Sequence, residues 1–367
     1  MMPLKNIGVH LSVITRYRYK WVLFIAIAWT LIDVYSWVHF MNKPYEERSE
    51  TVYQFLTPGA VLLRAAIDFM MSIFMGNMLV FRLRSLFKDY PLLLTLLLKT
   101  LILIVAAFLM NFLVHVTYSI FTLHLNIAQS LLNFQGEVLH RAWLFDNMTK
   151  WIIIFVITQL LIEINEKYSP GVFIDILVGR YINPKIERRI VMFIDLKDST
   201  PIAEQLGHKV YFRFIREFIA SISMALLENN GIIYQYVGDE IVVSWRDKPN
   251  NSMRCMQSIL ASRRAIQKRS ELFRRQFGIV PEFRMGIHVG EVTVGEIGII
   301  KKDLAMSGDT MNTTARIRTA CSELNQKFIA SKDFIDDLDL KEWQVESLGT
   351  IDLKGKSNGI ELFALKI

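Results

Sequence analysis

Two aspartates, each next to an apolar run, are the residues of this chain best placed to do chemistry. Asp195 lies in the run Val191–Leu196, and Asp239 follows Gly231–Val237 after a glycine. Runs rich in β-branched and aromatic residues are typical of buried strands. A Gly-Asp pair between two such runs, Gly231–Val237 and Ile241–Trp245, predicts a hairpin turn. If the hairpin lies beside the first strand, the carboxylates converge and favour a bound Mg²⁺ or Mn²⁺. The alternative is that both acids merely end strands.

A second pair of polar residues lies further along the chain. Asn312 and Arg316 follow the segment Ser307–Met311. Residues four apart on a helix point to the same side, and a guanidinium offers several fixed donors to phosphate oxygens. The alternative for Arg316 is an ordinary arginine on a helix surface.

Together these motifs resemble the class III nucleotidyl cyclases over about residues 186–367. The segments that carry the resemblance, in the family's order and spacing, are Phe193–Asp195, Gly238-Asp239, Gly286–Gly290, Asn312–Arg316 and Leu353–Lys356. The resemblance implies an α+β ferredoxin-like catalytic domain. It also implies the reaction, an in-line attack of a 3′-hydroxyl on the α-phosphorus of a nucleoside triphosphate, with release of pyrophosphate.

The resemblance assigns roles to individual residues. It implies two Mg²⁺ or Mn²⁺ ions per site, with Asp195, Asp239 and the main-chain carbonyl of Ile194 as ligands. Asn312 would act on the ribose and Arg316 on the phosphate in the transition state. One of two lysines, Lys354 or Lys356, would hold the departing phosphates. In this family the acids and the Asn/Arg pair come from opposite subunits, so a homodimer with two composite sites is expected.

The residues that select the base depart from the family pattern. Adenylate-forming members have Lys with Asp or Thr at two positions, and guanylate-forming members have Glu and often Cys; here they are Gln235 and Ala305. The amide of Gln235 can donate to or accept from either purine, whereas Ala305 offers no hydrogen bond. ATP is expected because it is the more frequent substrate in the family. A guanylate or dual-specificity cyclase, a diguanylate-type cyclase, and a membrane receptor with an inactive cyclase-like dimerisation module are the alternatives.

The composition divides the chain into a membrane part and a charged part. Hydrophobic residues make up 52% of the sequence, and a membrane span needs about 20 apolar residues. We therefore expect an all-α transmembrane bundle in residues 1–164, a coupling helix or linker in residues 165–187, and the catalytic domain in residues 188–367. The four expected spans are Trp21–Phe40, Leu56–Phe81, about Leu96–Phe121, and Trp151–Ile164.

The distribution of basic residues predicts the orientation. Lysines and arginines gather before the first span and after the second, which places both termini and the catalytic domain in the cytoplasm beneath the inner (plasma) membrane. The net charge of +7 then suits lysines and arginines that lie near the anionic lipids of the bilayer. Nucleic acid is not expected, because the sequence has no stretch in which basic and aromatic residues alternate. Two cysteines far apart in sequence suit a reducing compartment.

Ionisable residues inside the spans could form a sensor or a structural lock. Arg64 and Asp68 are four apart and can pair, and Asp33 could share Arg64. If they form a sensor, the sequence does not indicate which ligand the membrane part binds. Two of the three histidines His39, His115 and His124 could hold a haem, but we expect ordinary buried or interfacial histidines instead. A surface helix is expected at Leu125–Leu144.

The remaining elements follow from hydrophobic periodicity and from turn residues. Ser169 before Pro170 predicts the start of a linker helix. Long helices are expected at Ile202–Leu227 and Asn251–Phe277, the second with a solvated basic face. Two strands, Phe283–His288 and Glu291–Ile297, are expected to flank a turn at Val289-Gly290, and later strands at Phe328–Ala330, Trp343–Leu348 and Ile360–Leu365 complete the sheet.

Overall fold

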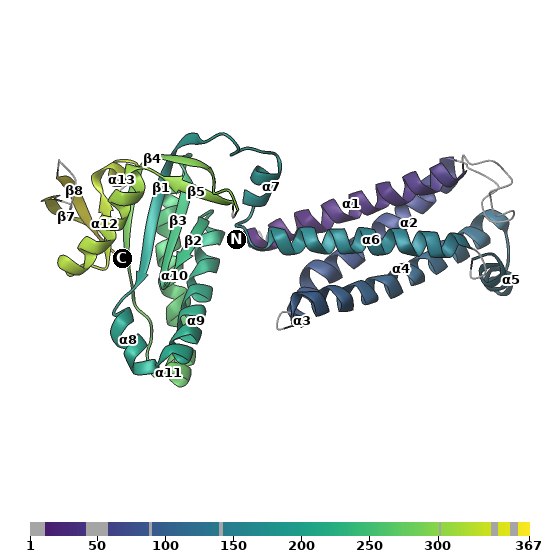
Figure 1. Cartoon of the computed structure of the whole chain (residues 1–367), viewed down its shortest axis with the longest axis horizontal. Helices are drawn as coiled ribbons and strands as arrows, with labels where there is room; N and C mark the ends of the chain where they lie inside the picture. Colours follow the sequence, from purple (N-terminus) through teal and green to yellow (C-terminus); the bar gives the residue numbers. More distant parts are fainter. Residues whose placement is uncertain are drawn as a thin grey trace, which may run out of the picture. The chain divides into compact units, whose positions relative to one another are not determined.

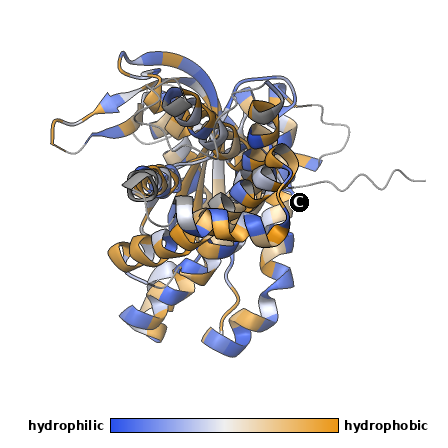
Figure 2. Cartoon of the chain, turned by 90° about the vertical axis from the view of Figure 1, so that its right-hand side faces the viewer, coloured by the Kyte–Doolittle hydropathy of each residue, from blue (hydrophilic) through white to orange (hydrophobic). Residues whose placement is uncertain are grey.

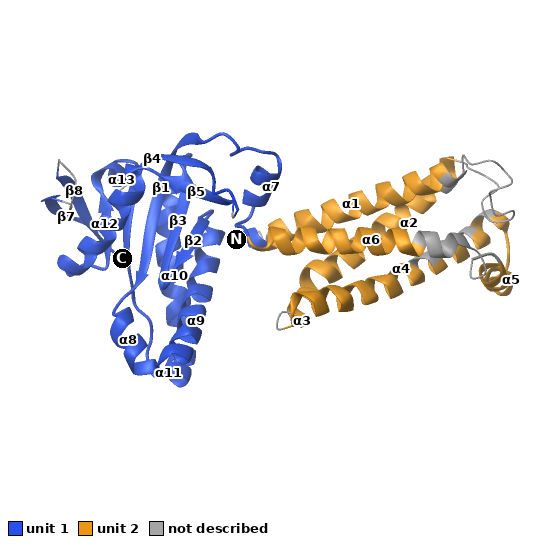
Figure 3. Cartoon of the chain, viewed as in Figure 1, with its two compact units in different colours: residues 1–14, 168–367 blue, residues 15–167 orange. Residues whose placement is uncertain are grey.

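The computed structural model describes residues 12–41, 58–87, 90–138, 142–300, 302–338, 344–352 and 359–367. The chain divides into two compact units (Figure 3), one of residues 15–167 and one that contains residues 168–367. The regular elements described in the first unit are helices, and the second unit is built on one large β-sheet (Figure 1).

Among its described residues, the helical unit contains four helices that are long and apolar enough to cross a membrane, as the sequence predicts. Figure 2 colours the residues of the chain by hydropathy, with hydrophobic residues in orange. Large side chains such as Leu31, Phe74 and Leu101 are exposed on the outside of this unit, which suits a lipid environment. The elements are α1 Val13–Met41, α2 Pro58–Asn77 with a π-helical continuation at Met78–Leu83, α3 Arg84–Leu86, α4 Leu92–Leu123, α5 Ile127–Asn133 with a π-helical turn at Phe134–Val138, and α6 Ala142–Asn165. A surface helix is expected at Leu125–Leu144; the described part of this range holds α5, the π-helical turn after it and the first residues of α6.

A buried ionic cluster joins α1 to α2. The guanidinium of Arg64 lies 2.6 Å from a carboxylate oxygen of Asp33, and 3.6 Å from one of Asp68. Both acids are almost fully buried. The pair expected from spacing alone, Arg64 with Asp68, is therefore the longer of the two contacts. The guanidinium also lies over the ring of Trp37, 5.3 Å from its centre. The cluster holds α1 and α2 together inside the bundle.

The second unit is an eight-stranded mixed sheet with helices on both faces. The strand order is β2-β3-β1-β4-β6-β8-β7, and β5 pairs with β4. The strands are β1 Lys185–Leu196, β2 Ile232–Val237, β3 Glu240–Arg246, β4 Phe283–Ile297, β5 Asp303–Ser307, β6 Phe328–Ser331, β7 Gln344–Ile351 and β8 Ile360–Lys366. The helices are α7 Val172–Leu177, α8 Ser199–Leu206, α9 His208–Glu228, α10 Asn251–Lys268, α11 Ser270–Phe277, α12 Asp309–Glu323 and α13 Lys332–Asp336.

Alternation along β1 sends its side chains to two different cores. Met192 and Ile194 pack against α9, α10 and α11 on one face of the sheet. Val191 and Phe193 belong to the opposite face, where β5 and the start of α12 cover the sheet. Because side chains alternate along a strand, Asp195 lies on the same face as Phe193, the face that carries α12.

Three further expected elements differ from the structure. The helix expected at Ile202–Leu227 is broken at Gly207, whose φ of +69° suits a glycine. The helix at Asn251–Phe277 is broken at Arg269, which is held by a 2.6 Å ion pair with Glu217. The turn expected at Val289-Gly290 is wrong, since β4 runs unbroken from Phe283 to Ile297.

The linker segment is bound to the edge of the sheet. The hydroxyl of Ser169 does not cap α7 as expected; it donates to the main-chain carbonyl of Ile233 at 2.7 Å. Asp175 of α7 forms a 2.5 Å ion pair with Arg246 at the end of β3. The buried phenol of Tyr181 lies within 3.4 Å of Arg246 and 3.3 Å of Arg189. Polar contacts therefore connect α7 to β3, and they connect the residues on either side of α7 to β1, β2 and β3.

Candidate active site

The hairpin between β2 and β3 brings the two predicted aspartates together. Ile194 of β1 pairs with Ile241 of β3, so Asp195 and the start of β3 meet at one end of the sheet. Gly238 has a φ of +63° and makes the two-residue turn that places Asp239 there. The two carboxyl groups lie near enough for the charge of Asp239 to raise the pKa of Asp195.

The electrostatics of this corner show how closely the acids are packed. Partial burial raises the pKa of Asp195, the attraction of Arg318 opposes this rise, and the charge of Asp239 adds to it. Burial likewise raises the pKa of Glu240, against the attraction of Arg318. Burial and then the charge of Asp239 raise the pKa of Tyr211 on α9. A cation would relieve this repulsion.

Two residues of the corner, Glu240 and Arg318, are absent from the sequence prediction. One guanidinium nitrogen of Arg318 lies 2.6 Å from a carboxylate oxygen of Glu240, and the other lies 3.5 Å from one of Asp195. Glu240 could have been found because it follows Asp239 directly. Arg318 could not, because its position depends on how α12 packs on the sheet.

The donor set of this corner fits a hard divalent cation. One carboxylate oxygen of Asp239 is buried without a hydrogen-bond partner, and carboxylate oxygens are ligands that Mg²⁺ and Mn²⁺ prefer. Within the described residues no group of three or more His, Cys, Asp or Glu is arranged to hold a metal ion. Two carboxylates are nevertheless sufficient for Mg²⁺ when substrate phosphates complete its coordination. The predicted ligand Ile194 is fully buried beside Asp195.

Two glycines of β4 fix the position of α12 on the sheet. A Cβ at Gly286 would lie 2.4 Å from the main-chain nitrogen of Arg318, and a Cβ at Gly290 would lie 2.5 Å from the hydroxyl of Thr310. Four residues of a strand span about 13 Å, and eight residues of a helix span about 12 Å. The helix therefore rests on both glycines, antiparallel to β4. This explains the glycines of the segment Gly286–Gly290.

The predicted catalytic pair lies on α12, on a different side from Arg318. Asn312 is exposed and Arg316 is half-buried. Residues two positions apart in a helix are separated by about 200° around its axis, so Arg316 and Arg318 project to opposite sides. The structure thus brings Asp195, Asp239, Glu240 and Arg318 into one cluster and leaves Asn312 and Arg316 outside it within one chain.

The two residues expected to select the base lie next to a contact between β2 and β5. The main-chain nitrogen of Met306 donates to the phenol of Tyr234 at 2.9 Å. Gln235 follows Tyr234 and is exposed, and Ala305 precedes Met306 and is half-buried. The remaining predicted site residues, Lys354 and Lys356, lie outside the described residues.

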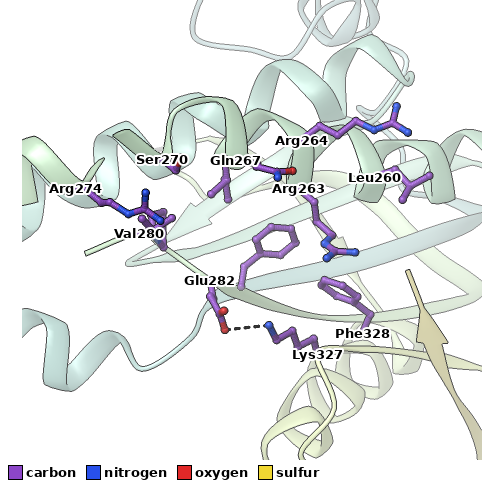
Figure 4. A pocket seen from close by; sticks show the side chains of 13 residues that line it. Leu260, Arg263, Arg264, Gln267, Ser270, Arg274, Val280, Glu282, Lys327 and Phe328 are labelled. Atoms are coloured by element: carbon purple, nitrogen blue, oxygen red, sulfur yellow. Dashed lines mark ion pairs between the residues drawn. The ribbon is translucent and has the colours of Figure 1, made fainter. Parts of the chain in front are cut away.

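A basic cleft of about 590 Å³ lies on the face of the sheet that carries α10 and α11, between these helices and the starts of β4 and β6 (Figure 4). Arg263 lies over the ring of Phe328, 5.9 Å from its centre, and it contacts the main-chain oxygen of Ile367. Lys327 pairs with Glu282 at 3.1 Å. The cleft contains no predicted site residue, and the basic face of α10, expected to be simply solvated, forms one of its walls.

Comparison with known proteins identifies the family. The sequence model described as "Adenylate and Guanylate cyclase catalytic domain" matches residues 183–366, half of the chain. The chain belongs to this cyclase family. The match includes the acidic corner, α12 and both glycines of β4, and the sheet unit is accordingly the cyclase domain.

Curated and solved relatives agree with this assignment. Adenylate cyclase 2 of Rhizobium meliloti is 31% identical over 215 residues, which are 58% of this chain and 58% of the relative. An adenylate cyclase of Anabaena cylindrica is 24% identical over 216 residues, which are 55% of this chain and 42% of the relative. The chain thus spans about half the length of these relatives. A bacterial light-regulated adenylyl cyclase structure shares the fold, with a TM-score of 0.52, 15% identity, and coverage of 62% of this chain and 66% of that one.

Proposed function

We propose that this chain is a membrane-anchored nucleotidyl cyclase that converts ATP to 3′,5′-cyclic AMP and pyrophosphate in a homodimer with two composite sites. The convergence of Asp195 and Asp239 at one corner of the sheet is the observation that carries the proposal. The family match and the similarity to adenylate cyclases of other organisms support it. The four apolar helices found among the described residues support membrane anchoring. The distribution of lysines and arginines supports a catalytic domain in the cytoplasm beneath the inner membrane.

The acidic corner would bind the metal ions that accompany the triphosphate. Asp195, Asp239 and the carbonyl of Ile194 would hold two Mg²⁺ or Mn²⁺ ions. Bound there, divalent cations would lower the pKa of the attacking hydroxyl and neutralise phosphate charge. The burial that raises the pKa of Asp195 also keeps water away from the corner, which strengthens its attraction for cations.

The exposed side of α12 would complete the site of the partner subunit. Asn312 would orient the ribose and Arg316 would stabilise the charge that develops on the α-phosphate, because a guanidinium presents fixed donors. Lys354 or Lys356 would hold the departing pyrophosphate. The orientation of Arg316, away from the acids of its own chain, supports a composite site, since one chain then supplies only half of the groups.

The choice between adenine and guanine as the base depends in part on Gln235. Its side chain is exposed and its amide can pair with either adenine or guanine. Ala305 adds no polar group to discriminate between them. A guanylate or dual-specificity cyclase is therefore the second candidate function.

Product analysis tests the proposal. The purified full-length protein is incubated with ATP or with GTP, each with Mg²⁺ or Mn²⁺, and the products are identified by mass. We expect cyclic AMP from ATP. Cyclic GMP as the main product would favour the second candidate, cyclic di-GMP would favour the diguanylate-type reaction, and no product in detergent or in lipid would favour an inactive dimerisation module.

Mixing two inactive variants tests the composite site. Asp195→Asn and Arg316→Ala should each be inactive alone, whereas heterodimers contain one intact site. Random exchange should restore about one quarter of the activity, because half of the dimers are mixed and each has one good site. Arg264→Gln, an exposed change on α10, is the control and should leave activity unchanged. Absence of any restoration in exchanged dimers would refute the composite site.

A further inference from the structure

Arg318 occupies the acidic corner in a way that the cyclase reaction does not require. Its guanidinium contacts Glu240 at 2.6 Å and Asp195 at 3.5 Å. The exposed fractions are 29% for Arg318, 25% for Asp195 and 13% for Glu240. Charges this far from bulk water attract each other more strongly than a fully exposed surface pair.

The fold holds the backbone of Arg318 close to the acids. The main chain of α12 at Arg318 packs directly on Gly286, and Gly286 pairs with Phe193 in the neighbouring strand. Asp195 lies two residues further along that strand on the same face. The guanidinium is therefore delivered to the corner by tight packing of helix on sheet.

The two contacts of Arg318 are unequal, and the difference matters for a cation. A metal ion needs Asp195 and Asp239, but it does not need Glu240. The shorter contact is with Glu240 and the longer one is with Asp195. Arg318 can thus give up Asp195 to an incoming cation while it keeps its stronger partner.

We propose that Arg318 is a built-in counter-cation of the metal site, which neutralises Asp195 and Glu240 in the metal-free protein and competes with the divalent cation for Asp195. This inference rests on the proposed function, because it takes Asp195 as a metal ligand. A free cation must then displace a positive charge, whereas a cation that arrives with a triphosphate brings additional ligands of its own. Arg318 would favour the metal–nucleotide complex over the free metal ion.

Titration of Mn²⁺ without nucleotide tests this role. Calorimetry is carried out on the full-length protein in detergent, for the wild type, Arg318→Gln and Arg318→Lys. A unit charge about 5 Å from a divalent ion changes its affinity about tenfold even at the dielectric constant of water. We expect Arg318→Gln to bind Mn²⁺ about tenfold more tightly and to have a lower melting temperature without metal. Arg318→Lys keeps the charge but lacks the planar, forked guanidinium, and its Mn²⁺ affinity should lie between those of the wild type and Arg318→Gln. The control, Arg264→Gln, should change neither quantity.

The outcomes separate this inference from the proposed function. Asp195→Asn should lose Mn²⁺ binding at the site. If Mn²⁺ binds this variant as tightly as the wild type, Asp195 is no ligand, and both the counter-cation role and the proposed metal site are overturned. If binding depends on Asp195 but Arg318→Gln leaves it unchanged or weaker, the counter-cation role is refuted and the metal site stands. Should Arg318→Gln fail to fold, Arg318→Met removes the same charge and keeps an apolar side chain, and an Mn²⁺ affinity equal to or weaker than that of the wild type refutes the role in its place.

Discussion

Replacement of Gly286 by alanine tests whether the contact between α12 and β4 sets the geometry of the active corner. The added methyl group would lie 2.4 Å from the main-chain nitrogen of Arg318 and 2.9 Å from the carbonyl carbon of Ile317. Normal carbon contacts are about 3.5–4.0 Å, so the helix backbone must retreat by about 1 Å. Gly290→Ala is the matched control on the same strand, because its methyl group meets the hydroxyl of Thr310, a side chain that can rotate away.

The expected loss of stability follows from two opposing effects. Overpacking of a core typically costs about 1–3 kcal/mol, and replacing a glycine inside a strand returns about 0.5–1 kcal/mol. We therefore expect Gly286→Ala to destabilise the cyclase domain by about 2 kcal/mol, since rigid backbone puts it at the upper end of that range. Gly290→Ala should cost about 1 kcal/mol, mainly through the hydrogen bond from Thr310 to the carbonyl of Glu291.

Thermal unfolding and turnover of the full-length protein measure the effect. For a unit of about 200 residues, 2 kcal/mol corresponds to a decrease of about 4–8 °C in melting temperature. Turnover of Gly286→Ala should fall about 100-fold, because a 1 Å displacement of catalytic groups has that consequence. A Gly286→Ala variant as stable and active as the wild type, or one less affected than Gly290→Ala, would refute the argument that the contact between Gly286 and the backbone of Arg318 positions α12.

Three further predictions concern other parts of the chain. Arg64→Met should lower the melting temperature of the full-length protein in detergent, since two buried carboxylates would lose their counter-charge at a cost of about 3–5 kcal/mol; an unchanged melting temperature would contradict the ionic cluster. Burial raises the pKa of Cys255 well above its ordinary value and that of Cys321 to about 12, so both thiols stay protonated at pH 8 and should react with a maleimide only after unfolding. Rapid labelling of the native protein at pH 8 would count against this. Arg246→Gln removes the ion pair with Asp175 and should speed limited proteolysis of the linker about tenfold, because a charge-assisted hydrogen bond contributes about 1.5 kcal/mol; equal cleavage rates would show that the pair does not hold the linker.

Elements defined by local signals could be predicted from the sequence. The hairpin around Gly238-Asp239 was expected because a two-residue turn between apolar runs has few alternatives. The four membrane helices were expected because only helices of that length satisfy the main chain in lipid. The convergence of Asp195 and Asp239 then follows, since both acids lie at the ends of neighbouring strands.

Features that depend on tertiary packing could not be predicted in this way. A glycine breaks a helix at Gly207, where φ is +69°, but lies inside a strand at Gly290, where Thr310 approaches it closely. The hydroxyl of Ser169 could cap a helix or bind a strand edge, and the position of β2 decides this. Arg318 joins the acids because α12 packs on Gly286. The sequence shows a helix with two arginines but does not say which of them faces the sheet.

The two-sided character of α12 has a consequence for how a dimer would respond to substrate. In the proposed homodimer, one helix contributes Arg318 to the cation site of its own chain and Arg316 to the phosphates bound by its neighbour. Binding of substrate at either catalytic centre would shift α12, which both centres share, and so change the geometry of the other centre. Saturation curves should then depart from simple hyperbolic form, with a Hill coefficient different from one, and Arg318→Gln should bring that coefficient closer to one.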